Sequence, residues 1–198
     1  CYVELAAGAG NDFGLTLKGL MILPRSQRVL EQECAVAETA NKLGIEARIL
    51  SAAQAREIEP AMRMEIAGAV LFPLDAHLVP QRLVALLTER IQQQGVRILW
   101  NTEAQSWRAS ASRVEALRTS HGEIVADEYV LAAGSWSPRS LSGLRMRLPV
   151  EAGKGYSITL PQPPVLPSIS AVLPEARVAV TPMGGALRFA GTMQFAGL

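Results

Sequence analysis

A short apolar run that ends at a glycine is the feature that most constrains the fold of this chain. Residues 130–133 read Val-Leu-Ala-Ala, which predicts a buried strand, and Gly134 follows directly. A glycine at the end of a strand has no Cβ, so another group can approach the backbone closely. In open α/β sheets, dinucleotides lie at that edge. The sequence therefore predicts a mixed α/β fold with a candidate nucleotide site at Gly134.

Length and charge narrow the class of protein. With 198 residues the chain is long enough for one large domain or two small ones. Its net charge of +1 does not favour a protein that binds nucleic acid electrostatically. No apolar run reaches the roughly 18 residues that would cross a membrane. The chain starts at Cys1 without an initiator methionine or a signal-peptide pattern, so we expect an internal fragment of a longer protein.

Few side chains carry chemistry of their own. Cys1 and Cys34 are the only cysteines, and His77 and His121 lie far apart without metal-ligand spacing. We therefore expect no metal site and no disulfide framework. The low cysteine count also favours a protein of a reducing compartment. No G-x-S-x-G motif accompanies the serines, so no catalytic side chain is assigned. His77 is expected to cap or fix the loop before the helix that Pro80 opens.

A glycine-rich stretch near the N-terminus imitates a dinucleotide fingerprint. Residues 8–14 contain three glycines, but a true fingerprint needs a helix directly after it to present backbone N–H groups to a pyrophosphate. Residues 15–23 predict a strand instead. We therefore interpret this stretch as an ordinary loop.

Three helices are predicted from their N-terminal signals. Ser26 is a good N-cap for a helix to about residue 43, with Gly44 just past its end. Ser51 and Gln54 form a capping box for a short helix that ends before Pro60. Pro80 opens the strongest helix, whose predicted buried stripe consists of Leu83, Val84, Leu87 and Ile91.

Strands are predicted where β-type alternation lies between turn residues. Besides 15–23 they are residues 45–50, 67–72, 96–100, 103–108, 113–120, a short strand after the turn within 122–129, and residues 129–133, 156–160, 177–181 and 186–190. The middle members form a β-meander, and a glycine pair at 184–185 joins the last two. A proline cluster at 161–167 predicts a stiff connector without regular structure.

Two runs together resemble one family. The run from Lys154 through Gly155, Tyr156 and Ser157 to Pro161 is the more discriminating, and the Ala-Ala-Gly-Ser-Trp-Ser run at 132–137 is the second. Over nearly its whole length the chain is similar to the FAD-dependent amino-acid oxidoreductases of the D-amino-acid oxidase and glycine oxidase superfamily. The bacterial D-amino-acid dehydrogenases of the small-subunit type are the nearest group.

The resemblance implies a fold and a division into domains. The family joins an FAD-binding α/β domain with a β-meander to an antiparallel-sheet substrate domain. It assigns residues 1–66 and 143–198 to the substrate domain and residues 67–142 to the FAD domain. The family's G-x-G-x-x-G segment, which holds the FAD pyrophosphate, would precede Cys1. Its C-terminal segment, with an arginine that grips the substrate carboxylate, would follow Leu198.

The resemblance also implies site residues, each with a plain packing alternative. The residues expected beside FAD are Ala133, Gly134, Ser135, Trp136 and, through its backbone, Ala104. The residues expected to line the substrate pocket are Tyr156, Thr192 and Met193. Some relatives place a substrate-binding tyrosine near Ala179, so its absence favours another carboxylate partner or a different substrate.

The implied activity is oxidation of D-amino acids to imino acids and then keto acids, by hydride transfer to the flavin. The alternatives are an amine oxidase or dehydrogenase for glycine, sarcosine or proline, and a non-catalytic ligand-binding domain. The electron acceptor is a quinone or oxygen, and the expected location is cytoplasmic, with contact to the inner membrane as a variant. We expect no turnover from this chain alone, and self-association through exposed apolar surface.

Overall fold

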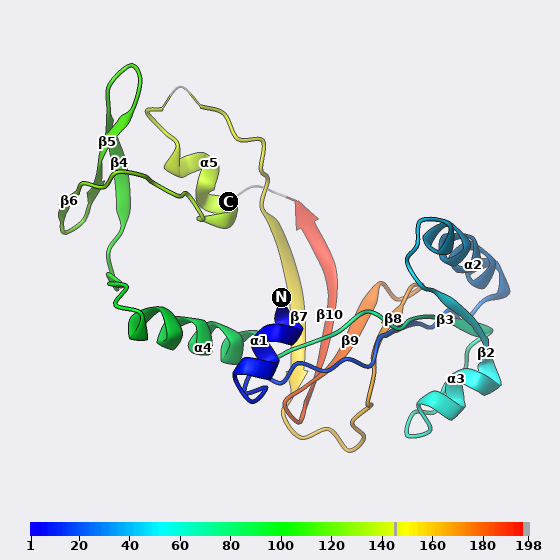
Figure 1. The fold of residues 1–198 in the computed structure, drawn as a ribbon. Coiled ribbons are helices and arrows are strands. Elements are labelled where there is room, and N and C mark those ends of the chain that lie inside the picture. The colour runs from blue at the N-terminus through cyan, green and yellow to red at the C-terminus, as the bar shows by residue number, and fades with distance from the viewer. Residues whose placement is uncertain (145, 196–198) are drawn as a thin grey trace. The chain divides into compact units, whose positions relative to one another are not determined.

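The computed structural model describes residues 1–144 and 146–195 (Figure 1). It divides into two compact units. The larger contains Cys1–Gln94 and Gly155–Met193, and the smaller contains Gly95–Lys154 together with Gln194 and Phe195. Helices and strands are mixed in the chain, so the predicted α/β class is confirmed. The division into a substrate domain and an FAD domain, with breaks at 66 and 142, remains a prediction.

The described chain forms one large mixed sheet, which lies mainly in the larger unit. Its strand order is β2-β3-β1-β8-β9-β10-β7. Strand β1 pairs parallel with β8, whereas the pairs β1–β3, β2–β3, β8–β9 and β9–β10 are antiparallel. The strands are β1 (Leu20–Ile22), β2 (Arg48–Ser51), β3 (Gly68–Phe72), β7 (Gly153–Leu160), β8 (Ser170–Leu173), β9 (Val178–Met183) and β10 (Ala186–Phe195).

Strand β3 is buried on both faces and organises the core. Because side chains alternate along a strand, Ala69 and Leu71 pack into one apolar cluster and Val70 into another. Helix α3 (Ala52–Ile58) contributes Ala55 to the first cluster, and α2 (Gln27–Lys42) contributes Ala37 to the second. The two helices accordingly lie on opposite faces of this part of the sheet (Figure 1). Each fully buried large apolar side chain contributes roughly 1.5–3 kcal/mol.

The predicted caps of these helices are confirmed. The Ser26 hydroxyl accepts a hydrogen bond from the Val29 N–H at the start of α2, and Gly44 follows its end with a φ of +81°. At α3, the Gln54 backbone N–H donates to the Ser51 hydroxyl at 3.2 Å, and the Ser51 backbone N–H donates to the side-chain Oε1 of Gln54 at 2.9 Å. These bonds satisfy N–H groups that a helix leaves unpaired.

A carboxylate from the far end of the chain adds a second cap to α2. One oxygen of Glu175 accepts hydrogen bonds from the N–H groups of Arg25 and Ser26, both at 3.0 Å, and from the Ser26 hydroxyl at 3.1 Å. The bond from the Ser26 N–H is the main cause that lowers the pKa of Glu175. Glu175 therefore ties the hairpin turn before β9 to the start of α2.

We expect Glu175→Gln to lower the Tm at neutral pH and to have little effect in acid. The folded-state pKa of Glu175 is lowered, so its stabilisation is present above the unfolded pKa of about 4.3 and is lost as the pH falls through the folded value. Thermal unfolding at pH 7 and pH 3 measures the difference. Glu57→Gln, an exposed carboxyl on α3, is the control. An equal effect of Glu175→Gln at both pH values would contradict this account.

Two helices, one at each end of the segment Cys1–Gln94, are only partly covered by the rest of the larger unit. Helix α1 spans Tyr2–Gly8, and α4 spans Pro80–Gln93 with the predicted proline in its first turn. The Arg90 guanidinium donates to the Gly8 carbonyl at 2.9 Å. The prediction of a buried stripe on α4 is wrong for this chain, because Val84, Leu87 and Ile91 are 62%, 41% and 38% exposed. The periodicity correctly indicated an amphipathic helix, but most of its apolar face is exposed, and Leu83 alone of the four predicted residues is partly buried.

The smaller unit contains the predicted meander. Strands β4 (Ala104–Ala109), β5 (Val114–Thr119) and β6 (Gly122–Ile124) form an antiparallel sheet. A 3-10 helix (Gly134–Trp136) and the short α5 (Ser137–Ser140) follow. The Trp107 indole N–H on β4 donates to the Ser140 carbonyl at 2.6 Å, and this bond ties α5 to the sheet.

Two predicted strands are wrong. Residues 96–100 and 129–133 belong to no strand, and Val96 and Val130 are 50% and 90% exposed. Apolar runs of this kind suit the interior of a parallel sheet, where neighbours on both sides supply hydrogen bonds and both faces are covered. The described chain supplies no such neighbours. Gly134 therefore does not end a strand here but begins the 3-10 helix. The strands expected at 15–23 and 45–50 are shorter, at Leu20–Ile22 and Arg48–Ser51.

Candidate functional site

The turn at residues 133–136 leaves its glycine open to approach. Ala133 precedes the 3-10 helix, and its carbonyl accepts a hydrogen bond from the Trp136 N–H at 3.0 Å. Gly134 has a φ of +54°, and a Cβ built on it would meet nothing within 4 Å. The Trp136 side chain is 58% exposed, and Ser135 is partly exposed. A bare backbone beside an exposed indole suits a flat aromatic cofactor, so these residues fit the expected group.

Ala104 lies at the start of β4 in the same unit. It is exposed and pairs with Thr119, and the register of the two strands shifts directly after it. The neighbouring Glu103 exchanges backbone and hydroxyl bonds with Ser120, each at 3.0 Å. The backbone around Ala104 is therefore fixed, while one side of the residue faces solvent.

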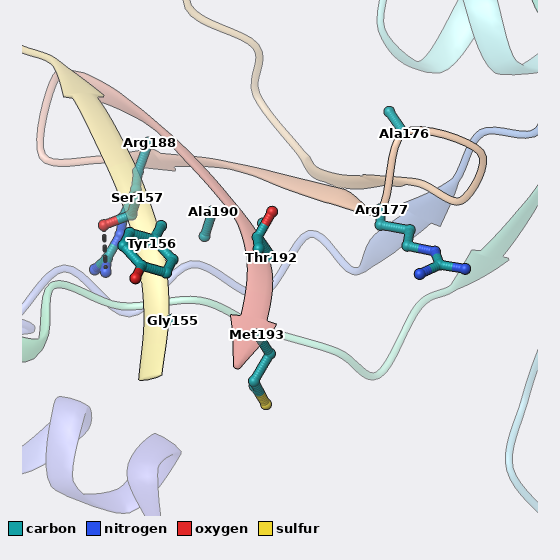
Figure 2. Close-up of a pocket in the computed structure, with 10 residues that line it drawn as sticks. Gly155, Tyr156, Ser157, Ala176, Arg177, Arg188, Ala190, Thr192 and Met193 are labelled. Atoms are coloured by element: carbon teal, nitrogen blue, oxygen red, sulfur yellow. Dashed lines mark hydrogen bonds between the residues drawn. The ribbon is translucent and has the colours of Figure 1, made fainter. Parts of the chain in front are cut away.

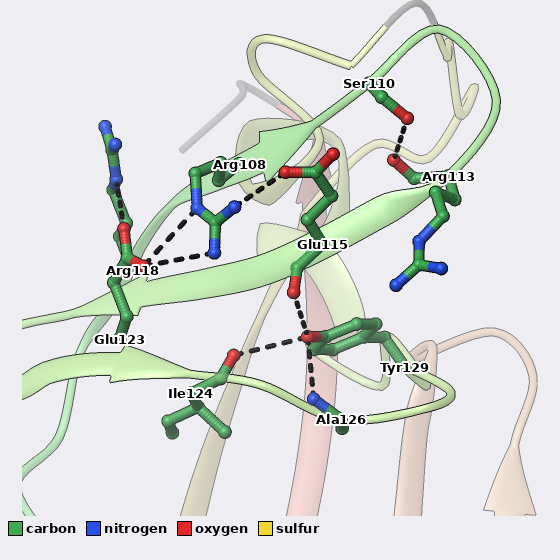
Figure 3. A network of polar contacts seen from close by, with 9 residues as sticks. All are labelled: Arg108, Ser110, Arg113, Glu115, Arg118, Glu123, Ile124, Ala126 and Tyr129. Atoms are coloured by element: carbon green, nitrogen blue, oxygen red, sulfur yellow. Dashed lines mark hydrogen bonds and ion pairs between the residues drawn. The ribbon is translucent and has the colours of Figure 1, made fainter.

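A surface network of ion pairs supports the meander (Figure 3). Arg108 contacts Glu115 at 2.6 Å and Glu123 at 3.4 Å, and Arg118 contacts Glu123 at 3.0 Å. The hydrogen bond from Arg118 is the main cause that lowers the pKa of Glu123. All four side chains are at least a third exposed, and surface pairs of this kind contribute about 0–1 kcal/mol each. We interpret the network as structural.

Tyr129 packs against the meander sheet in the same unit (Figure 3). Its hydroxyl accepts a hydrogen bond from the Ala126 N–H at 3.0 Å and lies 3.2 Å from the carbonyls of Glu115 and Ile124. Its ring packs edge-to-face against the Trp107 ring, with 5.6 Å between the ring centroids. These contacts anchor the chain just before the segment that leads to Gly134.

A second candidate site lies in the larger unit, where β7 and β10 run side by side (Figure 2). We call it the β7–β10 cavity. Its volume is about 830 Å³, and it is lined by Gly155, Tyr156, Ser157, Ala176, Arg177, Arg188, Ala190, Gly191, Thr192 and Met193. The three residues predicted for substrate, Tyr156, Thr192 and Met193, thus line one cavity, although they come from two strands. Their role in binding remains a prediction.

Backbone conformation is unusual at this cavity. Thr192 has a φ of +53°, in the left-handed region that β-branched residues avoid. Such outliers cost about 1–3 kcal/mol and gather at functional positions. Ala179 pairs across the sheet with Ala190 of the cavity wall. The wall at that point is therefore small and apolar.

Sequence reasoning missed Arg188. This arginine lies on β10 between Leu187 and Phe189, and its guanidinium donates to the Ser157 hydroxyl at 3.0 Å. A single charged residue inside an otherwise uncharged strand was the available signal. Arg188 belongs to neither of the two family-like runs, and its place in the cavity depends on the fold.

His77 has a structural environment. It exchanges backbone hydrogen bonds with Thr16 at 2.8 and 3.2 Å, and its ring nitrogen Nδ1 lies 3.0 Å from the Ser170 hydroxyl. Burial is the main cause that lowers the pKa of His77, followed by the charge of Lys18. These contacts agree with the expectation that His77 fixes the loop before α4.

Within the described ranges, no group of three or more His, Cys, Asp or Glu side chains could hold a metal ion. The described helices are all too short or too polar to cross a membrane.

Comparison with known proteins finds similarity to one enzyme family along nearly the whole chain. The family described as FAD dependent oxidoreductase (DAO) matches residues 1–197. A D-amino acid dehydrogenase from Paramagnetospirillum magneticum is 34% identical over 206 residues, covering 100% of this chain and 48% of the relative. One from Bradyrhizobium diazoefficiens is 30% identical over 202 residues, again covering 100% and 48%. The chain thus spans about half the length of these relatives.

Solved structures share the fold. Glycine oxidase from Geobacillus kaustophilus superposes with a TM-score of 0.87 at 24% identity, covering 99% of this chain and 53% of that one. L-proline dehydrogenase from P. horikoshii gives a TM-score of 0.83 at 17% identity, covering 97% and 53%.

Proposed function

This chain belongs to the DAO family of FAD-dependent oxidoreductases, and we propose that the complete gene product carrying it is a D-amino-acid dehydrogenase. The similarity to D-amino acid dehydrogenases along the whole chain carries the proposal. The proposed reaction converts a D-amino acid to an imino acid, which hydrolyses to a keto acid and ammonia. The part of the chain that the structure describes would supply binding surfaces to this reaction rather than a nucleophile.

We propose that Ala133, Gly134, Ser135 and Trp136 hold FAD together with the backbone of Ala104. When bound, the flavin supplies the hydride acceptor. The missing side chain of Gly134 lets the cofactor approach the backbone, and the exposed Trp136 indole covers one side of it. On this proposal residues 67–142 form part of the FAD domain, and residues 1–66 and 143–198 form part of the substrate domain.

The β7–β10 cavity is the proposed substrate pocket. Tyr156 and Met193, which are 49% and 67% exposed, offer apolar surface to the side chain of an amino acid. The Thr192 hydroxyl is a hydrogen-bond donor and acceptor at the same wall. These groups orient a substrate and exclude water from it, which is what a hydride transfer requires of the protein.

One observation favours a second candidate, an enzyme for glycine, sarcosine or proline. Ala179 pairs with Ala190 beside the cavity and so puts a methyl group where some relatives have a substrate-binding tyrosine. With a methyl group at this point, the wall leaves more room for an amine substituent such as that of sarcosine or proline.

A substrate panel with an artificial electron acceptor tests the proposal. We expect the complete gene product to turn over D-alanine with a kcat/KM at least about 10-fold above that for L-alanine, glycine, sarcosine and L-proline, since 1.4 kcal/mol of selective binding is enough for tenfold. Preference for glycine, sarcosine or L-proline would move the assignment to the second candidate. Binding of an amino acid without any turnover would favour a non-catalytic domain.

We propose either a membrane quinone or oxygen as the electron acceptor, in a cytoplasmic enzyme that touches the inner membrane if the acceptor is the quinone. Oxygen consumption by the purified protein, compared with reduction of a quinone in membranes, separates the two acceptors. The exposed apolar side chains Val130, Trp136 and Ile158 support self-association of the chain when it is taken alone.

A further inference from the structure

The methionines of this chain differ sharply in exposure. All six lie within the described residues, and only Met146 and Met193 expose most of their surface, at 66% and 67%. Met21 and Met64, at 0% and 6%, are buried in the first apolar cluster of the core. A reagent dissolved in water therefore reaches the sulfur atoms of Met146 and Met193 first.

Of these two residues, only Met193 lines the β7–β10 cavity. Its side chain extends from β10 away from that of the neighbouring Thr192 (Figure 2). With a volume of about 830 Å³, the cavity is large enough to admit a molecule as small as hydrogen peroxide to the sulfur. Met146 instead borders a separate cavity in the smaller unit, beside the turn between β4 and β5.

The thioether sulfur of methionine is a nucleophile that peroxides oxidise. The sulfur attacks one oxygen of hydrogen peroxide, the O–O bond breaks, and the departing hydroxide takes the proton of the transferred hydroxyl group and leaves as water. The sulfur gives up two electrons and becomes a sulfoxide, while the peroxide is reduced to water. A flexible apolar side chain is thereby converted into a polar one.

We propose that Met193 is a site of reversible oxidation by hydrogen peroxide, and that its sulfoxide weakens the binding of substrates with large apolar side chains in the β7–β10 cavity. The effect on binding rests on the function proposed above, in which Met193 offers apolar surface to a substrate, whereas the oxidation needs only the exposed sulfur. The peroxide can come from two sources. If oxygen is the electron acceptor, each turnover releases one molecule of it, and otherwise it comes from the surrounding solution.

The first test treats the complete gene product, loaded with FAD, with hydrogen peroxide and follows each methionine by peptide mass spectrometry. We expect Met193 to be oxidised at least about 10-fold faster than Met21 and Met64, because oxidation follows exposure of the sulfur. Oxidation of Met193 no faster than that of the two buried methionines would overturn the proposal.

The second test compares KM before and after the peroxide treatment of the same protein. For D-leucine the wild-type KM should rise about 3- to 10-fold, since a polar sulfoxide replaces apolar contact surface. For D-alanine, which has only one methyl group to contact Met193, the rise should be smaller. Treatment with methionine sulfoxide reductases should restore the original values. An unchanged KM for D-leucine once Met193 is fully oxidised would overturn the proposal.

Met193→Leu has no sulfur and a similar volume, so its KM for D-leucine should be the same before and after treatment. Met146→Leu is the matched control, since Met146 is exposed to nearly the same extent but lies outside the β7–β10 cavity. It should respond to peroxide as wild type does. A rise of KM in treated Met193→Leu equal to that of wild type would place the sensitive group elsewhere and refute the assignment.

Catalase distinguishes the two sources of the peroxide. Oxidation of Met193 during aerobic turnover of D-leucine, prevented by catalase, would assign the peroxide to the enzyme's own reaction. Oxidation by added peroxide alone would assign it to the solution, and either result supports the site. If the complete gene product turns over no amino acid, the proposed function fails, but the order in which added peroxide oxidises the methionines still decides whether Met193 is the preferred target.

Discussion

Replacing Gly134 with leucine is expected to lower the affinity of the complete gene product for FAD roughly 5- to 150-fold, the equivalent of 1–3 kcal/mol of steric conflict. A Cβ at Gly134 meets nothing within 4 Å, so the new side chain enters space that the protein itself does not use. On our account the cofactor occupies that space. Titration of the apoprotein with FAD, followed by flavin fluorescence, measures the change.

Gly143→Leu is the control for backbone strain in the same unit. Gly143 has a φ of +89° and also has nothing within 4 Å of an added Cβ, so leucine there is at least as strained as at Gly134. We expect the control to bind FAD as wild type does. Equal losses at the two positions would mean that strain, rather than contact with the cofactor, explains the effect.

The second large effect is expected at Gly19, where alanine should destabilise the protein by roughly 2–5 kcal/mol. Gly19 is buried between the end of β3 and the loop that follows it. Its φ is +84°, and an added Cβ would lie 2.7 Å from the Phe72 carbonyl oxygen and 3.0 Å from the Pro73 Cα. Both contacts are with backbone, which cannot rotate away. Urea unfolding of the complete gene product measures the loss.

Gly44→Ala isolates the contribution of the contacts. Gly44 has a φ of +81°, nearly that of Gly19, but its Cβ would meet nothing within 4 Å. We expect it to cost only the strain of the left-handed conformation, about 1–2 kcal/mol. If the two substitutions cost the same, the tight packing of Gly19 against β3 would be refuted.

Elements whose signals are local could be predicted from the sequence. The caps at Ser26 and Ser51 use side chains within three residues of the N–H groups that they bind, so short motifs identify them. The Gly184–Gly185 turn between β9 and β10 is equally local. The long helix with Pro80 in its first turn was found for the same reason.

Elements that depend on partners far away in the chain could not be predicted from the sequence. Residues 96–100 and 129–133 have strand composition, but a strand exists only where a neighbour accepts its hydrogen bonds, and the described chain offers none. The cap that Glu175 supplies to α2 joins residues about 150 positions apart, and no pattern in the sequence announces it. The exposed stripe on α4 is a third case, because its periodicity indicates a face but not what covers it.

In the candidate site, too, some residues could be predicted from the sequence, whereas one could be found only from contacts between distant residues. Resemblance to a family suggested Tyr156, Thr192 and Met193, and the structure places all three on one cavity. Arg188 was not suggested, because its importance depends on the hydroxyl of Ser157 on a strand 31 residues away and on the lack of any acid around it. Charge balance within a cavity becomes visible only after folding.

The most direct test of the account is the absorption spectrum of the complete gene product, recorded without oxygen before and after D-alanine is added. We predict a flavin band near 450 nm, roughly where bound flavins absorb, which D-alanine bleaches and L-alanine does not. A protein without that band, or with a band that no amino acid bleaches, would contradict the claim that this chain forms the interior of an amino-acid-oxidising flavoenzyme.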